Sequence, residues 1–237
     1  MLILKTTYKD NEFLTKEDIE LLEDESDPYY YDVYTLGEWG VLGDLIFTNW
    51  KIEDVLSNEE LVKTFDKFQH GLDFGYTNDP TAYNKIYYHP ALKKMWIVGE
   101  HNETGLTNEM IADRIKDMVG SDYVTCDSAE PKSIVELNGH GINAIGARKG
   151  KDSVLHGIQW LRGLEIIIDV RCQNTINDFQ LYQWKKDKDG TALNIPVDKN
   201  NHHPDAIRYA MEDYMLMNFN EDEPEELDDL ETANIDW

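Results

Sequence analysis

The sequence of 237 residues has few cysteines and few basic residues, and it lacks long apolar runs. Its two cysteines, Cys126 and Cys172, have no CxxC spacing, which excludes a disulfide scaffold and a cysteine-based zinc finger. No stretch of about 18 consecutive apolar residues occurs, so we expect no membrane span. Hydrophobic residues make up 41% of the chain and aromatic residues 11%, which is enough for a buried core and excludes wholesale disorder.

Basic residues are outnumbered, because 22 Lys and Arg face 47 Asp and Glu, for a formal net charge of −25. Such acidity argues against nucleic acid as a partner, since phosphate contacts rely on Lys and Arg. The acidity is concentrated at the two ends, however: residues 1–35 carry a net charge of −7 and residues 218–237 carry −9. The charge of the ends therefore need not describe the surface of the segment between them.

The chain divides into three parts by composition. Residues 1–57 contain a polar segment that favours a short helix over 13–26, followed by an aromatic, glycine-containing stretch that is typical of an ordered connector. Residues 58–217 form the regular domain. Residues 218–237 form an acidic tail that we expect to be disordered.

The regular part shows strand and helix patterns in turn. Short apolar runs bounded by turn residues predict strands, and apolar residues three or four positions apart predict helices. We expect strands over 69–76, 81–88, 95–100, 123–126, 142–147 and 166–168, helices over 107–118, 131–137, 153–161, 175–181 and 204–217, and a hairpin over 182–197. A three-stranded meander followed by alternating helix and strand predicts an α/β fold with a mixed β-sheet flanked by helices.

Three aspartates lie at positions where a charged side chain is energetically unfavourable or needs an explanation. Asp73 lies inside an apolar strand, Asp127 directly follows another strand, and Asp205 falls in the first turn of the last helix. Burying several carboxylates together is costly unless a cation compensates, and a divalent metal ion removes this cost. In a mixed sheet whose first strand is central, the three positions can converge at one edge, which favours a metal site.

Each aspartate also has a plain structural explanation. Asp205 near a helix N-terminus is favoured by the helix dipole, and Asp127 can begin the next helix. Asp73 has the weakest alternative, because strands disfavour Asp.

Two segments nearly match known motifs but carry no such function. The Asp-Phe-Gly at 73–75 has no kinase catalytic loop ahead of it, and the segment 146–151 lacks the glycine spacing of a P-loop.

Three segments resemble the nuclease motifs of the large terminase subunits of tailed bacteriophages. The segment GLDFGYTNDPTA at 71–82 resembles the first motif, CDSAEPKSI at 126–134 the second, and HHPDAIRYA at 202–210 the third. The motifs occur in the family's order, and the resemblance covers roughly residues 29–217. It implies a ribonuclease-H-like nuclease domain, with residues 1–57 as the extension that leads from an N-terminal ATPase domain.

The resemblance also implies functions for individual residues. Asp73, Asp127 and Asp205 would be the catalytic, metal-binding acids, and Asp79 would be a further metal ligand. All-oxygen ligands suit two divalent cations, Mg²⁺ or Mn²⁺. His202 matches a histidine near the site in some members and would orient water or contact a phosphate; the alternative is that it caps the final helix.

The implied activity is that of an endonuclease that cuts concatemeric viral double-stranded DNA during genome packaging by two-metal hydrolysis. The implied partners are DNA, the portal protein, the small terminase subunit and the terminase ATPase domain, in the host cell cytoplasm at the procapsid portal. For the DNA contacts we expect Arg148, Lys149 and Lys151, which cluster with Gly146 and Gly150. Ordinary solvated surface side chains are the alternative for this cluster.

Two other functions stay open. A resolvase or transposase relative would share the fold and cut DNA, but it would carry a different third motif. A non-catalytic module that docks on the portal or capsid would use the aromatic N-terminal stretch and the acidic tail as contact surfaces. Metal-dependent cleavage of DNA distinguishes the nucleases from the docking module.

Overall fold

The computed structural model describes residues 14–16, 19, 44–148, 150 and 153–221, with side chains to residue 216. All but four residues of the predicted helix over 13–26 lie outside the described residues, as does the tail from residue 222 onward. Within the described ranges, no helix combines the length and apolarity needed to cross a bilayer.

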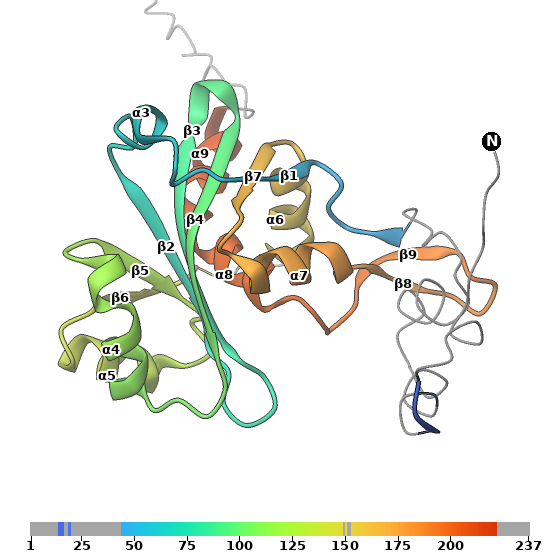
Figure 1. Ribbon diagram of the computed structural model, residues 1–237, viewed down its shortest axis with the longest axis horizontal. Coiled ribbons are helices and arrows are strands. Elements are labelled where there is room, and N and C mark those ends of the chain that lie inside the picture. The colour runs from blue at the N-terminus through green and yellow to red at the C-terminus, as the bar shows by residue number, and fades with distance from the viewer. Residues whose placement is uncertain (1–13, 17–18, 20–43, 149, 151–152, 222–237) are drawn as a thin grey trace, which may run out of the picture.

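The chain forms one large sheet, a separate two-stranded ribbon and a set of helices (Figure 1). The strands of the large sheet are β1 (Trp50–Glu53), β2 (Phe68–Asp73), β3 (Thr81–His89), β4 (Lys94–Glu103), β5 (Tyr123–Cys126), β6 (Asn143–Gly146) and β7 (Glu165–Asp169), and the ribbon consists of β8 (Trp184–Lys186) and β9 (Ala192–Pro196). The helices are α3 (Glu59–Val62), the 3-10 helix η4 (Pro90–Leu92), α4 (Asn108–Val119), α5 (Pro131–Gly139), α6 (Ser153–Arg162), α7 (Gln173–Leu181), α8 (His202–Ala210) and α9 (Glu212–Glu221).

The seven strands lie in the order β1-β7-β4-β3-β2-β5-β6. Strands β2, β3 and β4 form the predicted antiparallel meander. Strands β5 and β6 extend the sheet in parallel beyond β2, and β7 and β1 extend it in parallel beyond β4. The predicted fold class, a mixed sheet flanked by helices, is confirmed, and β2 has a paired strand on each side.

Different helices cover the two faces of the sheet. In Figure 1, α4 and α5 lie together on one side of β2, β3 and β4, and α6, α7 and α8 lie on the other. The alternation of side chains along a strand explains the division. In β4, Met95 and Ile97 join the core that contains Ile207 of α8, whereas Trp96 and Val98 face the opposite side.

The segment ahead of residue 58 contributes to this core. Strand β1 pairs in parallel with β7, and the side chains of Ile46 and Phe47 are fully buried. The Phe47 ring stacks on Phe179 of α7 with 4.8 Å between ring centroids. Residues 44–57 of the expected connector therefore pack against the regular domain, and the division of the chain at residue 58 stays a prediction. The sequence missed β1 because this strand is short and mostly exposed.

The last helical segment differs from the sequence prediction, which expected one helix over 204–217. The structure has two helices, α8 and α9, which are separated at Met211. Met211 is fully buried and its backbone angles, φ −97° and ψ 3°, depart from those of an α-helix, while the apolar pattern continues across the break. Helix α8 also begins earlier, at His202, and its N-cap residue is Asn201. The alternative that His202 caps this helix is therefore wrong.

Helix α8 lies directly against β2. A Cβ atom at Gly71 would stand 1.8 Å from the carbonyl oxygen of Ala206 and 3.0 Å from the Cβ atom of Ala210. Because only glycine leaves this space free, the strand and the helix approach each other backbone to backbone. This contact holds the first turns of α8 beside the end of β2, where Asp73 lies.

We expect Gly71→Ala to lower the free energy of unfolding by about 3 kcal/mol, since rotation of a side chain cannot relieve a clash with a backbone carbonyl. The matched control is Gly139→Ala at the exposed end of α5, where an added Cβ meets no atom within 4 Å. This control is expected to be neutral or to gain up to about 1 kcal/mol. Urea unfolding followed by circular dichroism measures both, and equal stability of Gly71→Ala and the parent would contradict the close packing of α8.

Candidate active site

Asp73, at the end of β2, is the buried centre of the acidic residues. It is 9% exposed, and its Oδ2 atom lies 3.1 Å from Nδ1 of His202 in α8. Burial raises the pKa of Asp73 to about 6; the contact with His202 opposes this rise, and the negative charges of Asp205 and Asp127 add to it. Asp205 and Asp127 therefore act electrostatically on Asp73, although the three acids come from different elements.

Asp127 reaches the site through the register of two strands. Strands β2 and β5 are parallel, with Leu72 opposite Cys126, and the N–H of Asp127 donates to the carbonyl of Leu72 at 3.1 Å. Asp73 and Asp127 therefore occupy corresponding positions at the carboxyl ends of adjacent strands. The Oδ1 atom of Asp127 also accepts the N–H of Ala129 at 2.9 Å, so this aspartate has the turn-forming contact considered from the sequence as well.

Asp205, in the first turn of α8, is held by donors on both carboxylate oxygens. Arg208 donates from Nε and Nη2 to Oδ1 at 3.2 and 3.1 Å, and Asn201 donates to Oδ2 at 3.2 Å. Arg208 is only 8% exposed, and its side chain crosses Gly157 of α6, where a Cβ atom would come within 2.3 Å of its Cδ. Burial raises the pKa of Asp205, and the charge of Arg208 opposes that rise. Arg208 thus orients Asp205 and balances part of its charge.

His202 stands between two acids. Its Nδ1 atom contacts Asp73, and its Nε2 atom lies 3.7 Å from Oδ1 of Asp79 in the loop between β2 and β3. The pKa of His202 is raised, first of all by the hydrogen bond with Asp73. Asp79 is 71% exposed at its side chain, so the imidazole connects the buried acid to the solvent-facing one.

The two helices beside the site are capped by other elements. Neither α7 nor α8 has an N-cap residue whose own side chain bonds a helix N–H. Instead, Glu100 of β4 accepts the N–H of Thr175 in α7 at 2.8 Å, and Asp178 of α7 accepts the N–H of His203 in α8 at 3.1 Å. A carboxylate at a helix N-terminus stabilises the free N–H groups and the helix dipole. The sequence of contacts from β4 through α7 to α8 fixes where α8 begins.

Asp178 is a residue near the site that the sequence did not single out. It is 8% exposed, and burial raises its pKa to about 6; its charged neighbours include His202 and Asp73. A signal was present in the sequence, because this carboxylate lies on the face of α7 that also buries Ile176 and Phe179. An acid on the apolar face of a helix needs a partner, which here is α8.

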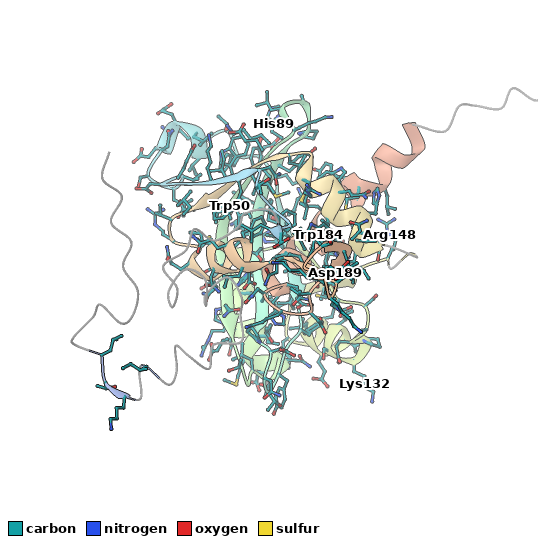
Figure 2. All side chains as sticks on the ribbon, turned by 90° about the vertical axis from the view of Figure 1, so that its right-hand side faces the viewer. Trp50, His89, Lys132, Arg148, Trp184 and Asp189 are labelled. Atoms are coloured by element: carbon teal, nitrogen blue, oxygen red, sulfur yellow. The ribbon has the colours of Figure 1, made fainter. Side chains whose placement is uncertain are left out.

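Of the three residues expected to contact DNA, the structure describes Arg148 (Figure 2). Its side chain is 65% exposed, and its guanidinium group contacts Glu212 and Asp213 of α9. Lys149 and Lys151 lie outside the described residues. Arg148 is thus a surface residue paired with two acids, and its role as a DNA contact stays a prediction.

The donor atoms of the site suit a hard divalent cation. Asp73, Asp127 and Asp205 offer the carboxylate oxygens that Mg²⁺ and Mn²⁺ prefer, and a cation would offset both the burial that raises the pKa of Asp73 and the added repulsion from Asp205 and Asp127. Within the described ranges, no group of three His, Cys, Asp or Glu side chains is already arranged to hold a metal ion. Both carboxylate oxygens of Asp205 already accept hydrogen bonds, Oδ1 from Arg208 and Oδ2 from Asn201.

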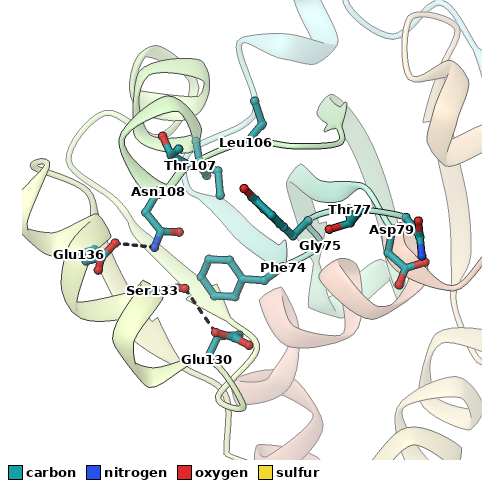
Figure 3. A pocket seen from close by; sticks show the side chains of 13 residues that line it. Phe74, Gly75, Thr77, Asp79, Leu106, Thr107, Asn108, Glu130, Ser133 and Glu136 are labelled. Atoms are coloured by element: carbon teal, nitrogen blue, oxygen red, sulfur yellow. Dashed lines mark hydrogen bonds between the residues drawn. The ribbon is translucent and has the colours of Figure 1, made fainter.

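Two hollows border the site on either side of the loop between β2 and β3. A groove of about 580 Å³ lies between this loop and the first turns of α4 and α5 (Figure 3). A smaller pocket of about 290 Å³ is lined by residues that include Asp178 and His202. Asp79 lines both hollows, and His202, which contacts Asp73, lines the smaller one.

A mixed sheet with an antiparallel meander, helices on both faces and acids at the ends of β2, β5 and in α8 defines a ribonuclease-H-like fold. Residues 73–213 match the family model described as Terminase RNAseH like domain. The chain belongs to this family, and the expected relation to large terminase subunits is confirmed.

Similar proteins come from phages of Bacillus. The terminase large subunit of Bacillus phage SPP1 is 37% identical over 215 residues, which are 87% of this chain and 51% of that protein. The PBSX phage terminase large subunit of Bacillus subtilis is 27% identical over 222 residues, which are 91% and 51% of the two proteins. The crystal structure of the SPP1 g2p nuclease domain with bound Mn matches with a TM-score of 0.67 and 36% identity, over 72% of this chain and 99% of that one. The chain spans about half the length of the curated relatives that it matches.

We expect Arg208→Gln to lower the free energy of unfolding by about 3 kcal/mol, because it leaves the buried carboxylate of Asp205 without its charged partner. The control is Arg114→Gln, which breaks an exposed ion pair with Glu103 and should change stability much less. Urea unfolding of the three proteins tests this. A loss no larger for Arg208→Gln than for Arg114→Gln would show that the pair does not stabilise the fold.

Proposed function

We propose that the chain is a metal-dependent endonuclease that cuts concatemeric viral double-stranded DNA during genome packaging. The observation that carries the proposal is the arrangement of Asp73, Asp127 and Asp205 at the ends of β2 and β5 and in the first turn of α8, where Asp73 is buried and the charges of the other two acids act on it. The 37% identity to the SPP1 large subunit, and the match to its nuclease domain with bound Mn, support a nuclease of this kind.

The mechanism we propose is hydrolysis of a phosphodiester bond with two divalent ions, Mg²⁺ or Mn²⁺, bound by the three acids and Asp79. These ions would supply Lewis acidity and lower the pKa of a bound water. Asp73 is the acid best placed to serve both ions, because it lies between the strand that carries Asp127 and the helix that carries Asp205. Arg208 keeps one oxygen of Asp205 oriented while the carboxylate serves as a ligand.

His202 has a defined part in this proposal. Its Nδ1 atom is engaged by Asp73 at 3.1 Å, so Nε2 is the ring atom that can meet a water or a phosphate oxygen. Nε2 lies 3.7 Å from Asp79, which is beyond hydrogen-bond distance and leaves room for such a contact. The raised pKa of His202 favours the protonated ring, which donates a hydrogen bond to an anion.

The setting of the activity belongs to the same proposal. We place the domain in a DNA-packaging motor, with double-stranded DNA as substrate and with the portal protein, the small terminase subunit and the terminase ATPase domain as partners. The site of action is then the host cell cytoplasm, at the procapsid portal. The family relation supports this setting, and the curated relatives are about twice as long as the chain.

Asp73→Asn and Asp127→Asn are expected to reduce Mn²⁺-dependent cleavage of supercoiled plasmid by more than about 100-fold, because each removes a ligand charge without changing the side-chain shape. Titration calorimetry should show weaker Mn²⁺ binding by the same two variants. The control is Asp117→Asn on the exposed face of α4, which should cleave and bind as the parent does.

Two results would contradict this proposal. Cleavage by Asp73→Asn and Asp127→Asn at the parent's rate would exclude the two-metal mechanism. A parent protein that binds no divalent ion and nicks no plasmid would favour the docking module instead.

Binding of DNA by the isolated chain is expected to be weak and to fall with salt, with a Kd above about 1 µM at physiological salt. Lys199 is the single Lys or Arg among the described residues that line either hollow beside the site, so few phosphates can be neutralised there. Fluorescence anisotropy with a labelled duplex at several salt concentrations measures this. Tight binding at physiological salt without metal would contradict the expectation.

A further inference from the structure

The groove beside the loop between β2 and β3 carries an exposed aromatic ring that the proposed hydrolysis does not use. Tyr76 is 63% exposed, follows Asp73 in this loop and lines the groove of about 580 Å³. This volume is in the range of sites that bind small molecules or single nucleotides. An exposed aromatic ring in such a place is a stacking surface for a flat ligand.

The backbone around Tyr76 is held firmly. A Cβ atom at Gly75 would come within 2.3 Å of the carbonyl oxygen of Asp79, so the loop is folded tightly on itself. The hydroxyl of Thr81 accepts from the N–H of Gly75 at 3.3 Å and donates to its carbonyl at 2.9 Å. The N–H of Gly105 donates to the carbonyl of Tyr76 at 2.7 Å. Because the backbone is already fixed, a ligand that stacks on the ring costs little further backbone entropy.

The chemistry of the groove suits a base better than a phosphate. No Lys or Arg occurs among the described residues that line it, whereas Glu130 and Glu136 do. Figure 3 shows Phe74 pointing from the loop toward Asn108 of α4 and Ser133 of α5. A phosphate in this groove would be repelled by these carboxylates, with no Lys or Arg among the described lining residues to compensate. A nucleobase offers a flat face to aromatic rings and N–H donors to carboxylates.

We propose that this groove binds one nucleobase of the DNA strand being cut, turned out of its stack, with the ring of Tyr76 as its stacking surface. The proposal rests on the proposed function, because it takes DNA as the ligand. Asp79 lines both the groove and the neighbouring pocket of the site, so the bound base belongs to a nucleotide close to the bond that is hydrolysed.

The test compares two single-stranded oligonucleotides of equal length and charge. One has a mixed sequence, and in the other each base is replaced by an abasic tetrahydrofuran unit. Affinities are measured by fluorescence anisotropy at low salt, with Ca²⁺ in place of Mn²⁺ and with intact strands verified on a gel. The proteins are the parent, Tyr76→Ala, Tyr76→Phe and the control Tyr123→Ala, whose tyrosine is 66% exposed at the start of β5.

The parent is expected to bind the base-bearing strand at least about fivefold more tightly than the abasic strand, the low end of one base–aromatic stack. Tyr76→Ala should lose this preference through weaker binding of the base-bearing strand alone. Tyr76→Phe should retain it, because the ring remains, and Tyr123→Ala should behave as the parent. Equal affinity of the parent for both strands would overturn the proposal, as would an equal loss for both strands in Tyr76→Ala.

Measuring binding keeps this test separate from the nuclease itself. A parent protein that cleaves plasmid with Mn²⁺ but does not distinguish the two strands keeps the proposed function and loses the base site. A parent protein that distinguishes the strands through Tyr76 but cleaves nothing keeps the base site and loses the nuclease.

Discussion

The position of helix α8 is the constraint on which the rest of the site depends. His202 and Asp205 both lie in its first turn, so any shift of the helix moves two of the residues proposed for catalysis. Three contacts fix the helix: the backbone approach at Gly71, the carboxylate of Asp178 at its N-terminus, and the crossing of Arg208 over α6. The first and third contacts are close steric approaches at glycines, and the second is a hydrogen bond to a carboxylate, so each allows little displacement of the helix.

The elements and acids that leave a local pattern were predictable from the sequence. Asp73 lies within the strand that the sequence predicts over 69–76, and is the last residue of β2 in the structure, while Asp127 follows another strand, so both stood out before any contact was known. Groups whose function depends on a distant partner were harder to predict. Asp178 shows only that an acid lies on the apolar face of α7, and its partner is known once α8 is placed against it; Glu100 is an ordinary strand residue until α7 is placed. The break at Met211 escaped because the apolar pattern runs on through it.

On the proposed function, the acidity of the chain requires that DNA be bound through more than surface cations. The one cation of the basic cluster that the structure describes, Arg148, is paired with acids of α9, and the hollows beside the site have Lys199 as their single described Lys or Arg. Divalent ions at the acids, the contact from His202 and the stacking of a base on Tyr76 would then bind the strand together. The remaining affinity would come from the partners of the packaging motor.

The hydrogen bond from the N–H of Asp127 to the carbonyl of Leu72 extends the pairing of β2 with β5 by one step. The separation of Asp73 and Asp127 is therefore a property of the strand ladder, set by the spacing of adjacent strands at about 4.8 Å, and not of the chain between them. Strands β3 and β4 and helix α4 lie in that intervening chain. The loops that connect these elements can lengthen or shorten while the two carboxylates keep their spacing. The relative position of Asp73 and Asp127 therefore does not depend on the length of the segment between them.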